Sequence, residues 1–374
     1  MSIFSRRGFM KGLTVLSSGS FLGVFGFSRS GRAQGANSRV ITLSDGQAWK
    51  GPNWTNSDLD QTVIKSMIVR GLKQLTGQAD AVAALATLIP LISDPAQRYG
   101  IKVNCVNSDL PSHPAVVAAT VELLVEAGAR ADNIIVYDRN DHELAACGYQ
   151  INSGPGCKYY GTNHDGVGLH HDWVNLTNGS VNFSSILTDR IDHIINIPVL
   201  KNHTMAGVTL ALKNHFGSIG QPEALHGAAN DCSPGIAELN AQDQIRNKTR
   251  LLIIDALFGN YKTGLYGKPD FAPMSLIVAS DPVAADTIGQ QLINARRARE
   301  DLAAIDAKHI KEAAQLGVGQ NDLSNIEHKT IEINPVIEKP KPWKNSGCAT
   351  AGSAGKVTGL AIATAGVLAL KRKN

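Results

Sequence analysis

The sequence is poor in several features that mark whole classes of protein. Five cysteines in 374 residues are too few for a disulfide scaffold. Charged residues make up only 18% and aromatic residues 5%, against 43% apolar residues, a globular balance that excludes disordered, collagenous and coiled-coil chains. There is no G-x-S-x-G, P-loop, H-E-x-x-H or G-x-G-x-x-G motif. The common signatures of serine hydrolases, nucleotide-binding loops and zinc proteases are therefore absent.

Positive charge is concentrated at the two ends of the chain. Residues 1–35 carry five basic and no acidic residues, and residues 347–374 carry four basic and no acidic residues. The segment between them has 27 basic and 32 acidic residues, so the formal net charge of +4 does not describe the body. Binding of nucleic acid calls for a basic patch on the folded body, so we expect no nucleic-acid partner.

The N-terminus is expected to be an export signal. The stretch Ser5–Lys11 contains Arg6 and Arg7, and the mildly apolar run Leu13–Phe27 follows it. This pattern resembles the twin-arginine signal, with small residues for cleavage around Ala33–Gly35. It predicts a signal peptide over residues 1–35, the twin-arginine translocase as partner, and export of the folded chain to the periplasm or cell surface. An ordinary amphipathic basic leader is the alternative.

The C-terminus is also expected to lie outside the soluble fold. Within residues 347–374, Gly347-Cys348 and a small-residue stretch precede the apolar run Val357–Leu370 and a terminal basic cluster. This order resembles the C-terminal sorting tails of bacterial surface proteins. The fourteen residues of the run fall short of the roughly 20 that a membrane-spanning helix needs. A weak membrane anchor or a frayed amphipathic tail is the alternative.

Strands and helices alternate along the body, residues 36–346. The strand 101–106, the helix 113–127 and the strand 134–137 follow one another at the spacing of a βαβ unit. We therefore predict an α/β fold with one main domain, a parallel or mixed sheet flanked by helices. The other expected elements are helices over 58–75 (capped by Ser57 or Asp58), 281–295 and 301–316, buried strands over 191–200, 251–255 and 275–279, and a long irregular loop over 150–182.

Histidines are concentrated in the middle of the chain. Nine of the eleven lie between residues 113 and 226. They are His113, His142, His164, His170, His171, His193, His203, His215 and His226. Because histidine is the commonest metal ligand and the usual acid or base near neutral pH, this density indicates a site. Chance composition with structural histidines is the alternative.

The segment Lys201–Gly217 combines two lysines and two histidines directly after a strand that ends at Leu200. Ligands of parallel sheets bind at the carboxyl ends of strands, and Gly207 and Gly217 allow close backbone approach. Lys213 lies in an apolar stretch, where loss of hydration would lower its pKa and make it a nucleophile or an anion ligand. The alternative is a lysine whose ammonium reaches the surface.

Several segments resemble the family called domain of unknown function 362. They are Gly100–Asn104 leading into the helix after Ser112, Val199–Gly217, Leu252–Ala256 and Ala279–Asp286. The resemblance runs in order over about residues 100–295. Some members of that family carry a ferredoxin-type cysteine cluster. This chain has no C-x-x-C, so we expect no iron–sulfur cluster.

A weaker likeness links the same region to nickel-pincer lactate racemases. His203, Gly207 and Lys213 reproduce their His-x3-Gly-x5-Lys spacing, and His226 follows. The likeness implies that His203 is an acid/base, that Lys213 holds a pincer nucleotide and that His226 ligates nickel. His142 is the counterpart of the second acid/base histidine, without its usual Thr-Gly-x-His context.

Lys201 and His215, from the same dense segment, complete the predicted site as a further cofactor-binding residue and a further metal ligand. The cofactor itself stays unassigned, with a metal ion or a pincer-type nickel nucleotide as the options.

Two classes of function remain open for this sequence. One is an enzyme with a metal or nucleotide-cofactor site that acts on a small anionic metabolite. The other is a non-catalytic ligand-binding or surface protein that retains the fold. Convergence of His203, Lys213 and His226 in one place would favour a functional site.

The four cysteines of the body leave their redox state open. Cys105, Cys147, Cys157 and Cys232 allow three pairings in an oxidising compartment, and Cys147 and Cys157 are the closest in sequence. Buried reduced thiols are the alternative.

Overall fold

A ten-stranded mixed sheet runs through the protein, of which the computed structural model describes residues 37–229 and 231–337. A two-stranded hairpin, β5–β6, stands apart from it. The strands are β1 (Ser38–Asp45), β2 (Tyr99–Lys102), β3 (Ile134–Tyr137), β4 (Lys158–Tyr159), β5 (Leu169–Leu176), β6 (Gly179–Ser184), β7 (His193–Asn196), β8 (Val199–His203), β9 (Gly207–Thr209), β10 (Thr249–Asn260), β11 (Ser275–Ala279) and β12 (Ile326–Asn334).

The order of strands along the sheet is β12-β1-β11-β10-β7-β2-β3-β4. Only β11 runs antiparallel along this path, pairing with β1 and β10 on its two sides. The strand β8 lies beside the second half of β10, and β9 folds back antiparallel to β8. The carboxyl ends of β10, β7, β2 and β3 consequently share one edge of the sheet.

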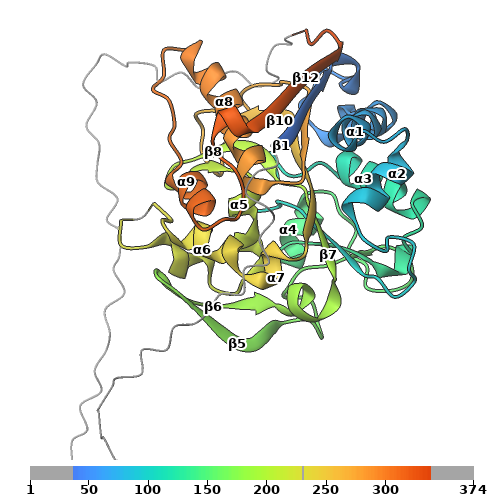
Figure 1. Cartoon of the computed structure of the whole chain (residues 1–374), viewed down its shortest axis with the longest axis vertical. Helices are drawn as coiled ribbons and strands as arrows, with labels where there is room; N and C mark the ends of the chain where they lie inside the picture. The colour runs from blue at the N-terminus through green and yellow to red at the C-terminus, as the bar shows by residue number, and fades with distance from the viewer. Residues whose placement is uncertain (1–36, 230, 338–374) are drawn as a thin grey trace, which may run out of the picture. The chain divides into compact units, whose positions relative to one another are not determined.

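Helices cover both faces of this sheet (Figure 1). One apolar core packs α1, α2, α3 and α4 against the sheet, and a second core packs α5, α6, α8 and α9 against the other face. The helices are α1 (Gln61–Thr76), α2 (Ala81–Leu88), α3 (Pro114–Glu126), α4 (Asp141–Ala146), α5 (Ala211–Asn214), α6 (Gly235–Ala241), α7 (Asp243–Arg246), α8 (Pro282–Ala298) and α9 (Lys308–Gln315). The predicted α/β fold is confirmed.

Local sequence accounts for where the first helix begins and ends. Ile64, Met67 and Leu72 recur at helical spacing and are buried against the sheet. The Asp60 carboxylate accepts hydrogen bonds from the first turn of α1, and Gly77 ends the helix with a φ of 76°. Asp60 therefore takes the capping role predicted for Ser57 or Asp58, which lie in a preceding 3-10 turn.

Most predicted elements are confirmed, and three are wrong in an informative way. The strand 191–200 is two strands, because Pro198 has no N–H for the ladder. The helix predicted from residue 301 begins only at Lys308, because Asn294 binds both the N–H and the carbonyl of Ile305 and holds that segment extended. The supposed irregular loop 150–182 contains β4, β5 and part of β6.

Two further expectations concern cysteines and chain ends. All four body cysteines are free thiols, so the Cys147–Cys157 pairing does not form and the reduced alternative holds. The proposed signal over 1–35 and tail over 347–374 lie outside the described residues. Among residues 37–337, with 230 left out, no helix is long and apolar enough to cross a membrane.

Candidate functional site

The candidate site lies at the point of the sheet where the connections between strands change from one face to the other. From β2 the chain crosses to β3 through α3, which belongs to the first core. From β7 it passes through β8, β9 and α5, which belong to the second core. Because β2 and β7 are neighbours, their carboxyl ends part at a topological switch point, the usual ligand position in open α/β sheets.

Three asparagines link the strand ends at this switch point. The Asn214 amide, at the end of α5, donates to Asn196 Oδ1 at 2.7 Å and to the Lys102 carbonyl at 3.3 Å. Asn104 Nδ2 donates to Asn214 Oδ1 at 3.0 Å. All three amides are buried, so the network fixes α5 to the ends of β2 and β7.

Lys102 is the structural lysine of this switch point. Its Nζ lies 2.7 Å from Asp138 Oδ1, and both side chains are buried. A Cβ on Gly217 would lie 2.0 Å from that carboxylate oxygen and 2.6 Å from Lys102 Nζ. The close backbone approach expected at Gly217 is present, and the missing side chain leaves room for this ion pair.

Lys213 has a different environment, with no carboxylate beside it. Its Nζ lies 3.8 Å from the ring centroid of Phe216, and the side chain is only 7% exposed. Within the described part of the chain, no hydrogen bond or ion pair to this ammonium is present. Burial lowers the pKa of Lys213 to about 8. The ammonium therefore has no charged partner among the described residues.

Lys201 lies on β8, fully buried. Its Nζ donates to Asn104 Oδ1 at 2.6 Å, which joins it to the asparagine network. Burial lowers the pKa of Lys201 to about 8, with the nearby charge of Asp138 opposing and that of Lys213 adding to the shift. Two weakly compensated ammonium groups therefore lie close together.

His203 ends β8 and has a fixed tautomer. Its Nδ1 accepts hydrogen bonds from the N–H groups of Met205 at 3.2 Å and Ala206 at 3.1 Å. The neutral ring therefore carries its proton on Nε2. Burial, together with the charge of Lys213, lowers the pKa of His203 to about 3, so the ring is neutral at physiological pH.

His309, on α9, is a site residue that the sequence did not indicate. The carbonyl of Ala206 accepts a hydrogen bond from its ring, and its Nε2 is buried with no partner among the described residues. Burial, and then the charge of Lys213, lowers the pKa of His309 to about 3. One residue, Ala206, thus orients two imidazoles: its N–H donates to His203, which leaves the Nε2–H of that ring free, and its carbonyl accepts from His309, which leaves the Nε2 lone pair of that ring free.

Gly207 allows α9, the helix that carries this histidine, to pack close to β9. Its φ is 82°, and a Cβ there would lie 3.1 Å from the Cβ of Ala307, just before α9. Glycine adopts this backbone conformation without a steric penalty. The close approach expected of Gly207 is therefore present, against a segment 100 residues further along the chain.

His226 and Cys232 complete the group around Lys213. His226 is partly exposed, and its ring centroid lies 6.2 Å from that of Phe216. Burial, followed by the charge of Lys213, lowers the pKa of His226, and burial raises the pKa of the Cys232 thiol. We call the set Lys213, His203, His226, His309, Phe216 and Cys232 the Lys213 cluster.

The structure thus brings His203, Lys213 and His226 together, with Lys201 alongside, but not the other two predicted residues. His142 is exposed on α4, and no described residue links it to the cluster. His215 is buried beside Asn196 and Ser218, and burial, with the charge of Lys102, lowers its pKa to about 3. His215 therefore belongs to the asparagine network and not to the Lys213 cluster.

Metal ligation by His226 and His215 stays a prediction. In residues 37–229 and 231–337, one group of three or more metal-ligating side chains has ligand atoms within 4.8 Å of one another: His170, His171 and Asp172. Neither predicted ligand belongs to it.

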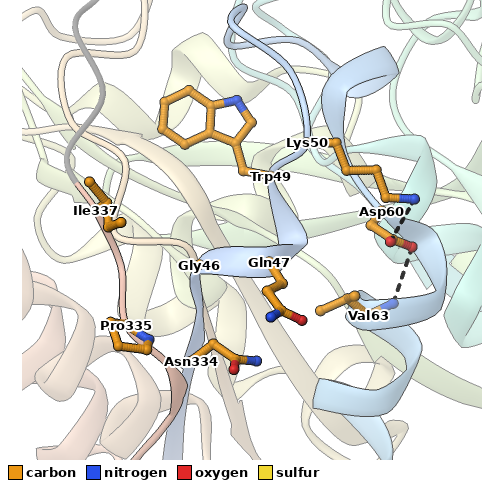
Figure 2. Close-up of a pocket in the computed structure, with 9 residues that line it drawn as sticks. All are labelled: Gly46, Gln47, Trp49, Lys50, Asp60, Val63, Asn334, Pro335 and Ile337. Atoms are coloured by element: carbon orange, nitrogen blue, oxygen red, sulfur yellow. Dashed lines mark hydrogen bonds and ion pairs between the residues drawn. The ribbon is translucent and has the colours of Figure 1, made fainter.

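A pocket lies at another place, at the carboxyl ends of β1 and β12 (Figure 2). Its volume is about 620 Å³. Its lining includes Trp49, Gln47 and Ile337, and a Lys50–Asp60 ion pair of 2.6 Å lies on one side. Its lining holds no histidine, cysteine or serine, so it offers no imidazole, thiol or serine hydroxyl to a ligand.

Comparison with solved structures adds only a distant likeness. The crystal structure of a protein from Thermotoga maritima, determined by a structural genomics consortium, shares 12% identity with a TM-score of 0.37. The similarity covers 71% of this chain and 60% of that one, so this chain spans less than two thirds of its length. No curated protein matches the chain.

The family comparison is decisive because it spans the site. The model of the family described as "Domain of unknown function (DUF362)" matches residues 100–291, more than half of the chain. The match extends from β2 to α8 and includes the asparagine network, Lys201, His203, Lys213 and His226. The protein belongs to the DUF362 family.

Proposed function

We propose that the protein binds a small anionic metabolite, or the anionic part of a cofactor, at the Lys213 cluster. The observation that carries this proposal is a buried ammonium, Lys213, without a carboxylate partner among residues 37–229 and 231–337. Isolated buried charges are costly, and proteins normally pair them. A bound anion would supply the missing partner, and Lys201 would add a second positive charge nearby.

The two oriented imidazoles give such a ligand polar contacts of both kinds. His203 offers its Nε2–H as donor, and His309 offers its Nε2 lone pair as acceptor. An anion that also carries a hydroxyl or a protonated oxygen would satisfy both. In the enzymatic version of the proposal, His203 is the group that exchanges a proton with the bound ligand.

A metal or nucleotide cofactor also fits these residues. Lys213 would hold the anionic cofactor and His226, which is partly exposed beside Phe216, would donate a ring nitrogen to a metal. A pincer-type nickel nucleotide is one such group. Elemental analysis by mass spectrometry of the protein purified from its native host tests this version, and stoichiometric nickel or zinc that is lost in His226→Ala would support it.

A ligand-binding protein without catalysis is the second candidate, and the pKa values favour it. At a pKa of about 3, His203 and His309 are poor proton acceptors at neutral pH in the free protein. A bound anion would raise both pKa values, because an opposite charge favours the imidazolium. The enzyme therefore requires that ligand binding shift these histidines, whereas the binding protein does not.

Titration of the full-length chain with inorganic phosphate and with acetate tests anion binding. We expect a saturable rise in the melting temperature, absent in Lys213→Met and at least ten-fold weaker in His309→Leu. His142→Ala is the matched control on an exposed histidine and should bind like the wild type. Equal stabilisation of the wild type and Lys213→Met by both anions would refute the site.

Proton exchange separates the two candidates. Solution NMR of the histidine side chains should show the His203 pKa rising to near neutral pH on ligand binding if the chain is an enzyme. A His203 pKa that stays well below neutral pH in the saturated complex would favour the binding protein.

For location, we propose export through the twin-arginine translocase, with the chain in the periplasm or at the cell surface and the C-terminal tail as a sorting signal or weak membrane attachment. The pair Arg6-Arg7 and the basic, apolar composition of both ends support it. Replacing both arginines by lysine should retain the precursor in the cytoplasm. Undiminished export of that variant would refute the route.

A further inference from the structure

The hairpin β5–β6 carries a cluster of ligand side chains outside the Lys213 cluster. Leu169 pairs with Ser184 and Trp173 with Asn182, so the three residues between them on β5 face a single residue of β6. This is a bulge, a feature that changes the direction of side chains. In a regular strand, consecutive side chains point to opposite faces. Here the rings of His170 and His171 have centroids 4.4 Å apart.

The carboxylate of Asp172 reaches both imidazoles of this bulge. Asp172 Oδ2 lies 3.6 Å from His170 Nδ1, and Asp172 Oδ1 lies 3.2 Å from His171 Nε2. Ligand atoms arranged tetrahedrally at about 2.0–2.1 Å from a zinc ion are about 3.3 Å from one another. The two nitrogen–oxygen distances in the bulge are close to this value, and one ligand atom of each of the three residues lies within 4.8 Å of the others.

A second carboxylate stands at the other edge of the cluster. Asp189 Oδ1 lies 4.0 Å from His170 Nε2. The negative charges of Asp172 and Asp189 favour a cation beside the rings. His171 and Asp172 are well exposed, so water can complete the coordination and the ion can exchange.

We infer that the β5 bulge is a surface site for a divalent transition-metal ion, bound by His170, His171 and Asp172. Two imidazoles and one carboxylate suit Zn²⁺, Ni²⁺ and Cu²⁺, whereas Ca²⁺ and Mg²⁺ prefer oxygen ligands alone. The site shares no residue with the Lys213 cluster, so this inference does not depend on the proposed function.

Calorimetric titration of the full-length chain, without a histidine tag, with Zn²⁺ tests this inference. We expect one ion bound at this site, with affinity at least ten-fold weaker in His171→Ala and in Asp172→Asn. His142→Ala removes another exposed histidine and should leave the affinity within two-fold. His226→Ala removes the metal ligand predicted from the sequence and should also leave it within two-fold.

Trp173 provides a local signal for the bound ion. Its side chain directly follows Asp172 and is 56% exposed. Saturating Cu²⁺ should quench tryptophan fluorescence in the wild type and much less in Trp173→Phe or His171→Ala. Zinc affinity that is unchanged in His171→Ala, or that is lost in His226→Ala instead, would overturn the assignment, as would the absence of zinc binding to the wild type.

Discussion

The two buried lysines of the site should respond to the same substitution with opposite signs. Lys102→Met leaves the buried Asp138 carboxylate with only the backbone N–H groups of Cys105 and Arg139. Breaking a buried ion pair in this way costs about 3–5 kcal/mol. Lys213→Met leaves no carboxylate without a partner, because no carboxylate lies within ion-pair distance of Lys213 in the described part of the chain.

The magnitude for Lys213 follows from its pKa. A fall from 10.5 to about 8 on burial corresponds to about 3 kcal/mol that the ammonium costs the folded state at pH 7. Lys213→Met removes this cost, but it also removes the contact between the ammonium and the Phe216 ring, which offsets about 1–2 kcal/mol of the stabilisation. Lys213→Met should therefore stabilise the ligand-free protein by about 1–2 kcal/mol.

Melting temperatures make this difference measurable. For a folded body of about 300 residues, the entropy of unfolding is about 0.6 kcal/mol/K. Lys102→Met should lower the melting temperature by about 5–8 °C at pH 7. Lys213→Met should raise it by about 2–3 °C in a buffer without added anions.

The pH dependence supplies a second readout. Between its folded pKa of about 8 and its unfolded value of 10.5, Lys213 binds fewer protons in the folded chain than in the unfolded one. The free energy of unfolding of the wild type therefore rises with pH across this window, and the advantage of Lys213→Met should disappear near pH 10. A loss of 5 °C or more in Lys213→Met at pH 7 would show that Lys213 is a structural lysine and would refute the reasoning.

Two further changes test the surroundings of the site. Gly217→Ala should lower the melting temperature by about 3–6 °C, because its Cβ would separate Lys102 from Asp138. Gly154→Ala, on an exposed turn where a Cβ would meet the Asn152 side-chain oxygen at 3.3 Å, should change it by less than about 1 °C. Equal effects would contradict this. When the protein is unfolded without reductant, Cys147 and Cys157 should both react as free thiols. Iodoacetamide should label Cys157 of the folded protein slowly, because burial raises the pKa of this thiol to about 11. A Cys147–Cys157 cross-link on a peptide map would exclude the reduced state.

Periodicity and turn residues predicted the framework of the fold well. The strands 134–137 and 275–279 appear with the predicted bounds, and the helix from Pro114 is confirmed because proline in the first turn and glycine after the end are strong local signals. The hairpin β5–β6 escaped prediction because its bulge breaks the alternation that marks a strand.

The candidate site could be predicted only in the part that is local in sequence. The spacing of His203 and Lys213 after a strand indicated where to look. His309 gave no signal, because one histidine on a short amphipathic helix is as easily structural, and its role depends on a contact through Gly207. His142 and His215 were predicted as site residues, but neither belongs to the Lys213 cluster. Position in the sequence does not determine the direction in which a side chain points.

The position of β1 has a consequence for the order in which the chain folds. This strand is the first of the described sequence, yet it lies between β12 and β11 and pairs with no strand closer to it in sequence. Its register joins Ser38 to Ile326 and Val40 to Ala279. During synthesis, β1 must wait for residues more than 230 positions later, so this half of the sheet cannot close on a growing chain. Such distant pairing slows folding and exposes apolar strands such as Val40–Leu43 to aggregation, so the protein should depend on chaperones until β12 is made.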